Sequence, residues 1–270
     1  MKIYVVKFGG NAIRGKEDLA RLSGEVAELI RNGANIILVH GGGPEISAEM
    51  EKRGLEPKKV AGLRITDEST LKVAEEVLGA INKDVVSSLT ESSVTAVGMP
   101  GHMCTLCKKK EPYEAADDGK KIVVDPGLVG EVVGINKDTL LDLLGSGVTP
   151  VIYPIGKDEN GKLLNVNADT MAAGIAAGID CEELIMITDV PGILLDVKDP
   201  SSKIDKLTLK RVDELIADGT ISGGMIPKVD ACRDALKAGV KTVRMVNGKD
   251  QRNILTDVIK NVPHGTIITV

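Results

Sequence analysis

Short Val- and Ile-rich runs alternate with longer segments of helical periodicity along almost the whole chain. The runs predict strands at residues 3–8, 35–40, 94–97, 148–153, 183–188, 240–246 and 266–270. The segments between them predict helices at residues 16–32, 44–54, 67–80, 81–91, 137–144, 168–178, 208–218, 228–238 and 251–260. Because strands that alternate with helices are joined by right-handed crossovers, we expect an α/β fold, a three-layer α/β/α sandwich with a mostly parallel central sheet.

The stretch 99–134 interrupts this alternation. It is rich in glycine and proline, which favour hairpins or a lid over a crossover helix. No linker-like segment divides the chain of 270 residues. We therefore expect any two lobes to share one continuous sheet.

Composition argues against several classes of partner. Aromatic residues make up 1% of the chain and the formal net charge is −5, so a nucleic-acid partner is not expected. The apolar run at 171–179 is shorter than the roughly 20 residues of a membrane-spanning helix, and the N-terminus lacks the longer run of a signal peptide. We expect a cytoplasmic protein with no membrane partner, and free thiols rather than disulfides.

Glycines gather where predicted strands end, at Gly9–Gly10, Gly41–Gly43, Gly192 and Gly223–Gly224. In open α/β sheets, ligands bind beyond the carboxyl ends of the strands. Glycine there lets backbone N–H groups approach an anion, and the helix that follows adds its positive end. One such cluster is equally consistent with a tight turn, whereas four of them favour a phosphate site.

Two lysines flank these clusters. Lys7 lies in an otherwise apolar strand, where a lysine is unusual unless its amine reaches solvent or an anion. Lys228 lies at the predicted start of a helix, where a cation opposes the helix dipole unless an anion binds there. Each lysine taken alone is also consistent with a solvated surface side chain.

Polar side chains occur at two further points. Asn165, Asn167 and Asp169 alternate before an Ala-rich helix, which suits either helix capping or a hydrogen-bonded acceptor beside a carboxylate that orients lysines. Arg64 precedes a predicted N-cap at Thr66 or Asp67, and its guanidinium could bind a carboxylate through two hydrogen bonds.

Two other patterns are weaker. Residues 10–17 fit the start of a phosphate-binding P-loop, but Glu17 stands where that loop needs Ser or Thr to hold Mg²⁺. His102, Cys104 and Cys107 could supply three zinc ligands, but a structural site needs four, so free thiols are the simpler interpretation. The run Lys108–Lys110 is interpreted as a solvated surface.

Six motifs together identify a known pattern. They are V-K-F-G-G at 6–10, H-G-G-G-P at 40–44, G-L-R-I-T-D at 62–67, N-V-N-A-D at 165–169, T-D-V-P-G-I-L at 188–194 and G-G-M-I-P-K at 223–228. In order and spacing the chain resembles the amino acid kinase family, most closely its N-acetylglutamate kinases. The resemblance implies ATP-dependent phosphorylation of the side-chain carboxylate of N-acetyl-L-glutamate, in arginine biosynthesis.

The resemblance also implies a role for each matching residue. Lys7 and Lys228 would stabilise the transferring phosphoryl group, and Asp169 would hold both lysines. The acceptor would be bound by Gly42, Gly43, Arg64 and Asn165. The ATP site would include Gly9, Gly10, Asp189, Val190, Gly192, Ile193, Leu194, Thr220, Ile221 and Ser222. Mg²⁺ would be held mainly by the phosphates of ATP, without protein ligands of its own.

The resemblance further divides the chain into an acceptor-binding and dimerisation lobe at 1–180 and an ATP-binding lobe at 181–270. Because the sequence begins almost at its first strand, without the extra helix of arginine-inhibited relatives, we expect a homodimer.

Two alternatives stay open. Because the segment 99–107 departs from the family pattern, the acceptor could be aminoadipate or glutamate, either acetylated or carried on a small acidic protein that docks on Lys108–Lys110. A non-catalytic sensor is the other alternative, although Lys7, Asp169 and Lys228 are all present.

Overall fold

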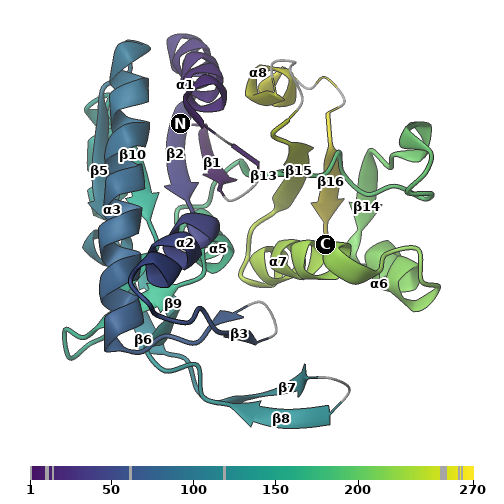
Figure 1. Ribbon diagram of the computed structural model, residues 1–270. Coiled ribbons are helices and arrows are strands. Elements are labelled where there is room, and N and C mark those ends of the chain that lie inside the picture. The colour runs from purple at the N-terminus through teal and green to yellow at the C-terminus, as the bar shows by residue number, and fades with distance from the viewer. Residues whose placement is uncertain are drawn as a thin grey trace.

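A computed structural model describes residues 2–9, 12–13, 15–60, 63–117, 120–249, 254–260, 262 and 264–270. Its centre is an eight-stranded sheet with the order β14-β16-β15-β13-β1-β2-β10-β5 (Figure 1). Neighbouring strands are parallel except β15 and β16. The strands are β1 (Ile3–Phe8), β2 (Asn35–His40), β5 (Ala96–Pro100), β10 (Thr149–Tyr153), β13 (Glu183–Thr188), β14 (Lys206–Thr208), β15 (Thr242–Asn247) and β16 (Thr266–Thr269). The predicted continuous, mostly parallel sheet is confirmed.

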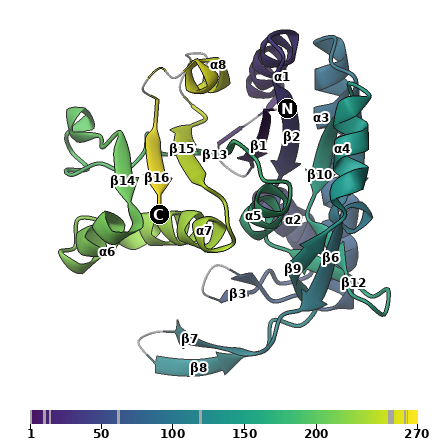
Figure 2. The same ribbon diagram turned by 180° about the vertical axis from the view of Figure 1, so that it is seen from behind.

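Helices cover both faces of this sheet (Figures 1 and 2). One layer holds α1 (Gly15–Arg31), α3 (Glu68–Glu91) and α8 (Ile254–Ile259). The other holds α4 (Lys137–Gly145), α5 (Ala168–Gly178), α6 (Leu209–Ala217) and α7 (Ile226–Lys237). The predicted three-layer sandwich is therefore confirmed.

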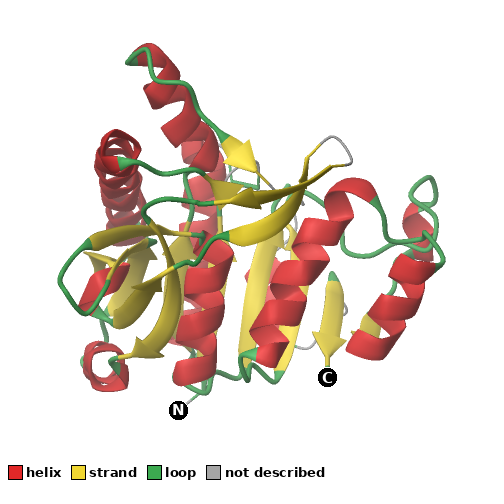
Figure 3. Cartoon of the chain, turned by 90° about the horizontal axis from the view of Figure 1, so that it is seen from below, coloured by secondary structure: helices red, strands yellow, loops and turns green. Residues whose placement is uncertain are grey.

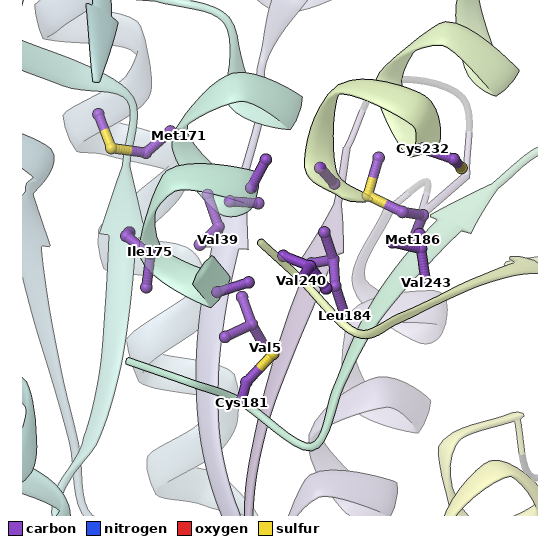
Figure 4. Close-up of a cluster of buried hydrophobic side chains, with 14 of the residues drawn as sticks. Val5, Val39, Met171, Ile175, Cys181, Leu184, Met186, Cys232, Val240 and Val243 are labelled. Atoms are coloured by element: carbon purple, nitrogen blue, oxygen red, sulfur yellow. The ribbon is translucent and has the colours of Figure 1, made fainter. Parts of the chain in front are cut away.

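Alternation along the strands explains the two layers. In β1, Val5 packs into the core beneath α5 and α7, while Tyr4 and Val6 pack into the core beneath α1. Figure 4 shows Val5 among the buried side chains of the first core, with Met171 from α5 and Cys232 from α7. Both faces of the central strands are apolar, as is typical of a parallel sheet covered on both sides.

A smaller sheet extends beyond the carboxyl ends of the central strands, where Figures 1 and 2 label β6 and β9, and Figure 3 views the chain from this end. It has the order β11-β12-β9-β6, formed by β6 (Thr105–Lys109), β9 (Val129–Ile135), β11 (Ile155–Lys157) and β12 (Leu163–Val166). Two hairpins accompany it: β3 (Lys59–Val60) with β4 (Leu63–Arg64), and β7 (Tyr113–Asp117) with β8 (Lys120–Val124). The expectation of hairpins in 99–134 is confirmed, whereas the small sheet was not predicted.

One helix differs from its prediction. Residues 67–80 and 81–91 were expected as two helices, but α3 is continuous over 24 residues. Asp67 caps it by accepting a hydrogen bond from the Thr70 backbone N–H. Gly79 does not end the helix, because one interior glycine costs only about 1 kcal/mol and buried neighbours such as Leu78 offset it.

Short elements complete the chain. The helix α2 (Gly43–Lys52) lies directly after β2, and single 3₁₀ turns are η1 (Gly101–Met103), η2 (Pro200–Ser202) and η3 (Gly223–Met225). Among the described residues, no helix is both long and apolar enough to cross a bilayer.

Candidate active site

Two clefts meet at the carboxyl end of β1, and both are lined by Lys7, Gly9 and Asp169. The first, which we call the Arg64 cleft, has a volume of about 270 Å³ and is also lined by the loop Gly41–Gly43, Lys59, Arg64 and Asn165. The second, the Lys228 cleft, has about 240 Å³ and is also lined by Asp189, Lys228 and the end of β13. A ligand in each cleft would therefore meet the other at Lys7.

Lys7 forms an ion pair at this junction. Its Nζ lies 2.7 Å from Oδ1 of Asp169, and both side chains are partly buried. The contact lacks hydrogen-bond geometry, so Asp169 Oδ1 has no hydrogen-bond partner among the described residues. Asp169 lies in the first turn of α5, where the helix dipole favours a carboxylate. The carboxylate of Asp169 therefore neutralises the charge of Lys7 at the junction of the two clefts.

Lys228 has a different partner from the one expected. Its Nζ donates a hydrogen bond to Oδ1 of Asp189, the residue that follows β13. This hydrogen bond is the main reason that the pKa of Asp189 is lowered. Asp169 lines the same cleft as Lys228, but no contact links the two in the described part of the chain. The two lysines are thus held by two carboxylates rather than by Asp169 alone.

The loop after β2 approaches β1 closely. Gly9 has φ +155°, and a Cβ there would lie 2.8 Å from the Gly41 nitrogen, so a side chain at Gly9 would collide with the loop. Gly42 precedes α2, and Gly43 begins it, with Pro44 next. The N–H groups of Gly42 and Gly43 make no hydrogen bond to any described residue. They are free donors at a helix N-terminus, which suits an anion. Gly10 lies outside the described residues.

Arg64 is a buried cation, only 7% exposed. Its Nη2 donates to the Gly43 carbonyl (2.9 Å) and to Ser47 Oγ (2.8 Å), and its Nη1 contacts the sulfur of Met50 (3.2 Å). All of these acceptors are neutral, and no carboxylate of the described chain pairs with Arg64. Burial lowers the pKa of Arg64. A buried guanidinium without a counter-ion favours an anionic ligand.

Asn165 faces the same cleft from β12. Its Nδ2 donates to Thr66 Oγ1 (3.1 Å), and Thr66 Oγ1 donates to the Arg64 carbonyl (3.0 Å). The fully buried Thr66 thereby links Arg64 and Asn165, two of the residues predicted to bind the phosphoryl acceptor. Asn167 instead caps α5, because its Oδ1 accepts from the N–H groups of Asp169 and Thr170. The capping interpretation is thus confirmed for Asn167, whereas Asn165 faces the cleft and its predicted role toward an acceptor stays a prediction.

The predicted nucleotide residues separate into two groups. Gly9 and Asp189 line the Lys228 cleft. The remaining described residues do not line it: Val190, Gly192, Ile193, Leu194, Thr220, Ile221 and Ser222. Ile193 and Ile221 lie in the core, and the Ile193 N–H donates to Thr266 Oγ1 (2.9 Å). A Cβ at Gly192 would lie 2.5 Å from that hydroxyl. Gly192 and Ile193 therefore pack against Thr266 of β16 rather than in the wall of the cleft.

The His102, Cys104 and Cys107 group shows no metal-site geometry. Cys104 and Cys107 are buried in the core, and burial raises the pKa of Cys104 to about 12. Such a thiol stays protonated and is a poor metal ligand. No cluster of three or more His, Cys, Asp or Glu side chains that could hold a metal occurs within the described ranges.

Two contributors were missed from sequence. Lys59, on the β3–β4 hairpin, lines the Arg64 cleft, and its pKa is lowered by burial and by nearby Arg64. His40 is fully buried behind the glycine loop. The histidine could have been flagged, because it directly precedes three glycines. Lys59 gave no signal, because it is one of several lysines and glutamates in an exposed stretch.

The arrangement suits transfer between two anions. Arg64, Lys59 and free N–H groups surround one cleft, Lys228 lies in the other, and Lys7 is common to both. No serine or cysteine nucleophile paired with a histidine lines either cleft as described. Charge neutralisation and positioning are what phosphoryl transfer requires.

Comparison with known proteins supports this chemistry. The profile of the amino acid kinase family matches residues 2–247. The chain is 44% identical to acetylglutamate kinase of Methanocaldococcus jannaschii, covering 99% of this chain and 90% of the relative. It is 45% identical to acetylglutamate kinase of Methanococcus aeolicus, covering 98% and 91%.

Among solved structures, N-acetylglutamate synthase from Neisseria gonorrhoeae, complexed with coenzyme A and N-acetyl-glutamate, superposes with a TM-score of 0.81. The two are 22% identical, and the match covers 100% of this chain and 59% of the synthase, so it shows the shared fold alone. On the family profile and the full-length relatives, the chain belongs to the amino acid kinase family.

Proposed function

We propose that this protein is an acetylglutamate kinase, which transfers the γ-phosphoryl group of ATP to the side-chain carboxylate of N-acetyl-L-glutamate. The observation that carries the proposal is the junction at Lys7 of a cleft suited to a carboxylic acid and a cleft suited to a phosphate. Full-length relatives named acetylglutamate kinase, at 44% and 45% identity, support the same substrate.

In the proposed reaction a carboxylate oxygen of the acceptor attacks the γ-phosphorus. A new O–P bond forms, the bond from the γ-phosphorus to the β–γ bridging oxygen breaks, and ADP leaves with that electron pair. The carboxylate is already ionised, so no general base is needed. Lys7, from the acceptor side, and Lys228, from the donor side, would neutralise the charge spread over the phosphoryl oxygens.

The acceptor would lie in the Arg64 cleft. Arg64 and the Asn165 amide would bind its α-carboxylate and amide, and the N–H groups of Gly42 and Gly43 would bind the reacting end. Arg64 is already held by three neutral groups, so little freedom is lost when the acid binds. Lys59, which also lines this cleft, adds positive charge.

Membership of a kinase family implies ATP as the phosphoryl donor. We propose that it lies in the Lys228 cleft, with Val190–Leu194 and Thr220–Ser222 beside the nucleoside. Asp169 and Asp189 offer oxygen ligands of the kind that Mg²⁺ prefers, although each is paired with a lysine. Bound Mg²⁺ would be held mainly by the phosphates and would add positive charge there.

The assignment of 1–180 to acceptor binding and 181–270 to ATP binding is part of this proposal. It is supported by the Arg64 cleft, which is lined only by residues from the first range. We also propose a homodimer in the cytoplasm. The strand β5 ends the central sheet and exposes Val97, which leaves an edge for a second copy. Molar mass from light scattering tests the dimer.

The carrier-protein alternative is less well supported. Lys108 and Lys110 lie 3.7 and 2.6 Å from Glu131, and Lys109 lies 3.8 Å from Asp125. The run is therefore partly neutralised by its own neighbours and offers little net charge to an acidic carrier.

ADP release coupled to NADH oxidation, with hydroxylamine trapping of the acyl phosphate, tests the proposal. We expect turnover with N-acetyl-L-glutamate and at least tenfold lower kcat/KM with N-acetylaminoadipate, since one extra methylene is worth roughly 10–200-fold in a fitted pocket. Absence of hydroxamate with N-acetylglutamate would contradict the substrate. Absence of turnover with every acid, despite ATP binding, would favour the sensor.

A further inference from the structure

The glycine loop is supported from behind by a buried polar pair, His40 and Asn82. His40 is the last residue of β2 and is fully buried; Asn82 lies in the middle of α3 and is 4% exposed. Neither lines the Arg64 cleft or the Lys228 cleft. Buried polar groups of this kind are costly unless they are hydrogen-bonded, so their partners show what they support.

The hydrogen bonds of this pair form a chain in which Asn82 donates to His40 and His40 donates to the Gly41 carbonyl. Asn82 Nδ2 lies 3.0 Å from His40 Nε2 and 3.0 Å from the Val151 carbonyl. His40 Nδ1 lies 3.0 Å from the Gly41 carbonyl. A carbonyl can only accept, so Nδ1 must carry the proton and Nε2 must accept from the Asn82 amide.

The other amide atom of Asn82 is fixed by packing. A Cβ at Gly98 would lie 1.9 Å from Asn82 Oδ1, so this oxygen lies directly against the Gly98 backbone. The Val151 carbonyl can only accept, so the amide atom that faces it and His40 must be Nδ2, which has two acceptors for its two protons. Burial also lowers the pKa of His40 to about 4, which keeps the ring neutral with one proton to place.

The consequence for the loop follows from the planar peptide. The Gly41 carbonyl and the Gly42 N–H belong to one trans peptide unit and point in opposite directions. A hydrogen bond that fixes the Gly41 carbonyl behind the loop therefore fixes the direction of the Gly42 N–H. That N–H has no acceptor among the described residues, and Gly42 lines the Arg64 cleft.

We propose that His40 and Asn82 are positioning residues, which hold the Gly41–Gly42 peptide so that the Gly42 N–H points at the reacting acceptor oxygen. The inference rests on the proposed function for the identity of that oxygen. The tautomer of His40 and the direction of the peptide do not depend on it.

The tautomer is tested first, without substrate. Long-range proton–nitrogen NMR of the full chain labelled on histidine distinguishes Nδ1–H from Nε2–H rings, and His40→Asn assigns the signal among the three histidines. We expect His40 to be neutral with its proton on Nδ1. A proton on Nε2, or a charged ring near neutral pH, would overturn the proposal even if the enzyme phosphorylates N-acetylglutamate.

Kinetics then test the positioning role. In His40→Asn and Asn82→Leu we expect kcat to fall about 10- to 100-fold, less than removal of an oxyanion donor costs, with the KM for ATP changed by less than about two-fold. The double variant should lose no more than the worse single variant, because both act through one proton. Additive losses, or a parallel rise in the KM for ATP, would contradict the role.

Ser23→Ala is the matched control. Ser23 is fully buried in α1 and hydrogen-bonded to Ser88 of α3 (2.9 Å), so its loss removes a buried contact of the same helix away from the loop. We expect its kcat to stay near that of the wild type. An equal loss in this control would show a general packing effect and would overturn the positioning role. Should the His40 and Asn82 variants fail to fold, the tautomer of the wild type decides, with the His40 signal assigned by elimination from variants of His102 and His264.

Discussion

The Arg64 cleft and the Lys228 cleft each contain a positively charged side chain, but the two side chains differ in their partners. Arg64 is buried, is held by neutral acceptors and has no anion among the described residues, so its positive charge is positioned by the protein itself and is available to an anion. Lys228 is more exposed and already paired with Asp189. Under the proposed function, the acid would meet a side chain that the protein already positions, whereas ATP would have to compete with Asp189 for Lys228.

Lys7 belongs to both clefts, so its loss should have the largest effect. In Lys7→Ala we expect kcat to fall by about 10³-fold, because the variant removes charge stabilisation at the transferring phosphoryl group. Lys2→Ala, an exposed lysine just before β1, is the matched control and should stay active. A Lys7→Ala rate within tenfold of the wild type would show that the two clefts do not meet at this amine.

Lys228→Ala should affect only the donor side. We expect kcat to fall by about 10²- to 10³-fold while the KM for N-acetylglutamate stays unchanged, since Lys228 does not line the acceptor cleft. Steady-state kinetics with each substrate varied in turn measures both values. A large rise in the KM for the acid would place Lys228 in acceptor binding and remove the contrast between the clefts.

Arg64→Lys should weaken binding of the acceptor acid without affecting binding of ATP. Lysine keeps the charge but loses the planar guanidinium that holds Gly43 and Ser47. We expect the KM for N-acetylglutamate to rise about 10- to 100-fold and the KM for ATP to stay constant. Arg53→Lys, an exposed arginine paired with Glu49 and Glu76, is the control. Equal changes in both KM values would contradict a preformed acceptor site.

Asp189 gives a smaller, pH-dependent effect. Its pKa is lowered by the hydrogen bond from Lys228, so the pair stabilises the fold above the ordinary carboxyl pKa of about 4 and loses that contribution as the pH falls through the lowered pKa. Urea unfolding of wild type and Asp189→Asn across this range should show a difference below about 1 kcal/mol at neutral pH that vanishes in acid. A difference that grows in acid would contradict the pairing.

Cysteine reactivity should give the smallest effect. Cys232 is buried in α7, the helix that carries Lys228, while Cys104 is buried beside the small sheet. Burial raises the pKa of each thiol to about 12, so modification requires local opening. We expect ATP to slow thiol modification at Cys232 more than at Cys104, measured by peptide mass spectrometry. Equal protection would indicate that both sides open together.

Much of the architecture could be predicted because it depends on local pattern. The strand limits at β1, β2 and β13 follow from apolar runs, and α5 follows from an Asn cap before an Ala-rich segment. The small sheet could not be predicted, because β12 is only four residues long and pairs with β9, distant in sequence. Short strands carry too little periodicity to stand out.

In the site, too, residues within motifs could be predicted, whereas contacts between distant elements could not. Lys7, Arg64, Asn165 and Lys228 were found from their motifs, and the structure places each in one of the two clefts. The Lys228–Asp189 pair was missed, because motif matching named Asp169 as the partner of both lysines. Ion pairs across elements depend on how β13 and α7 approach each other, and no local pattern records that distance.

The most direct test is a crystal structure with N-acetylglutamate and a non-hydrolysable ATP analogue bound together. We expect Lys228 to leave Asp189 and contact the phosphates, Lys7 to touch both ligands, and Arg64 to keep its bonds to Gly43 and Ser47 while binding the acid. If Lys228 stays on Asp189 with the phosphates bound elsewhere, or if Lys7 touches neither ligand, the proposed division of labour between the two clefts is wrong.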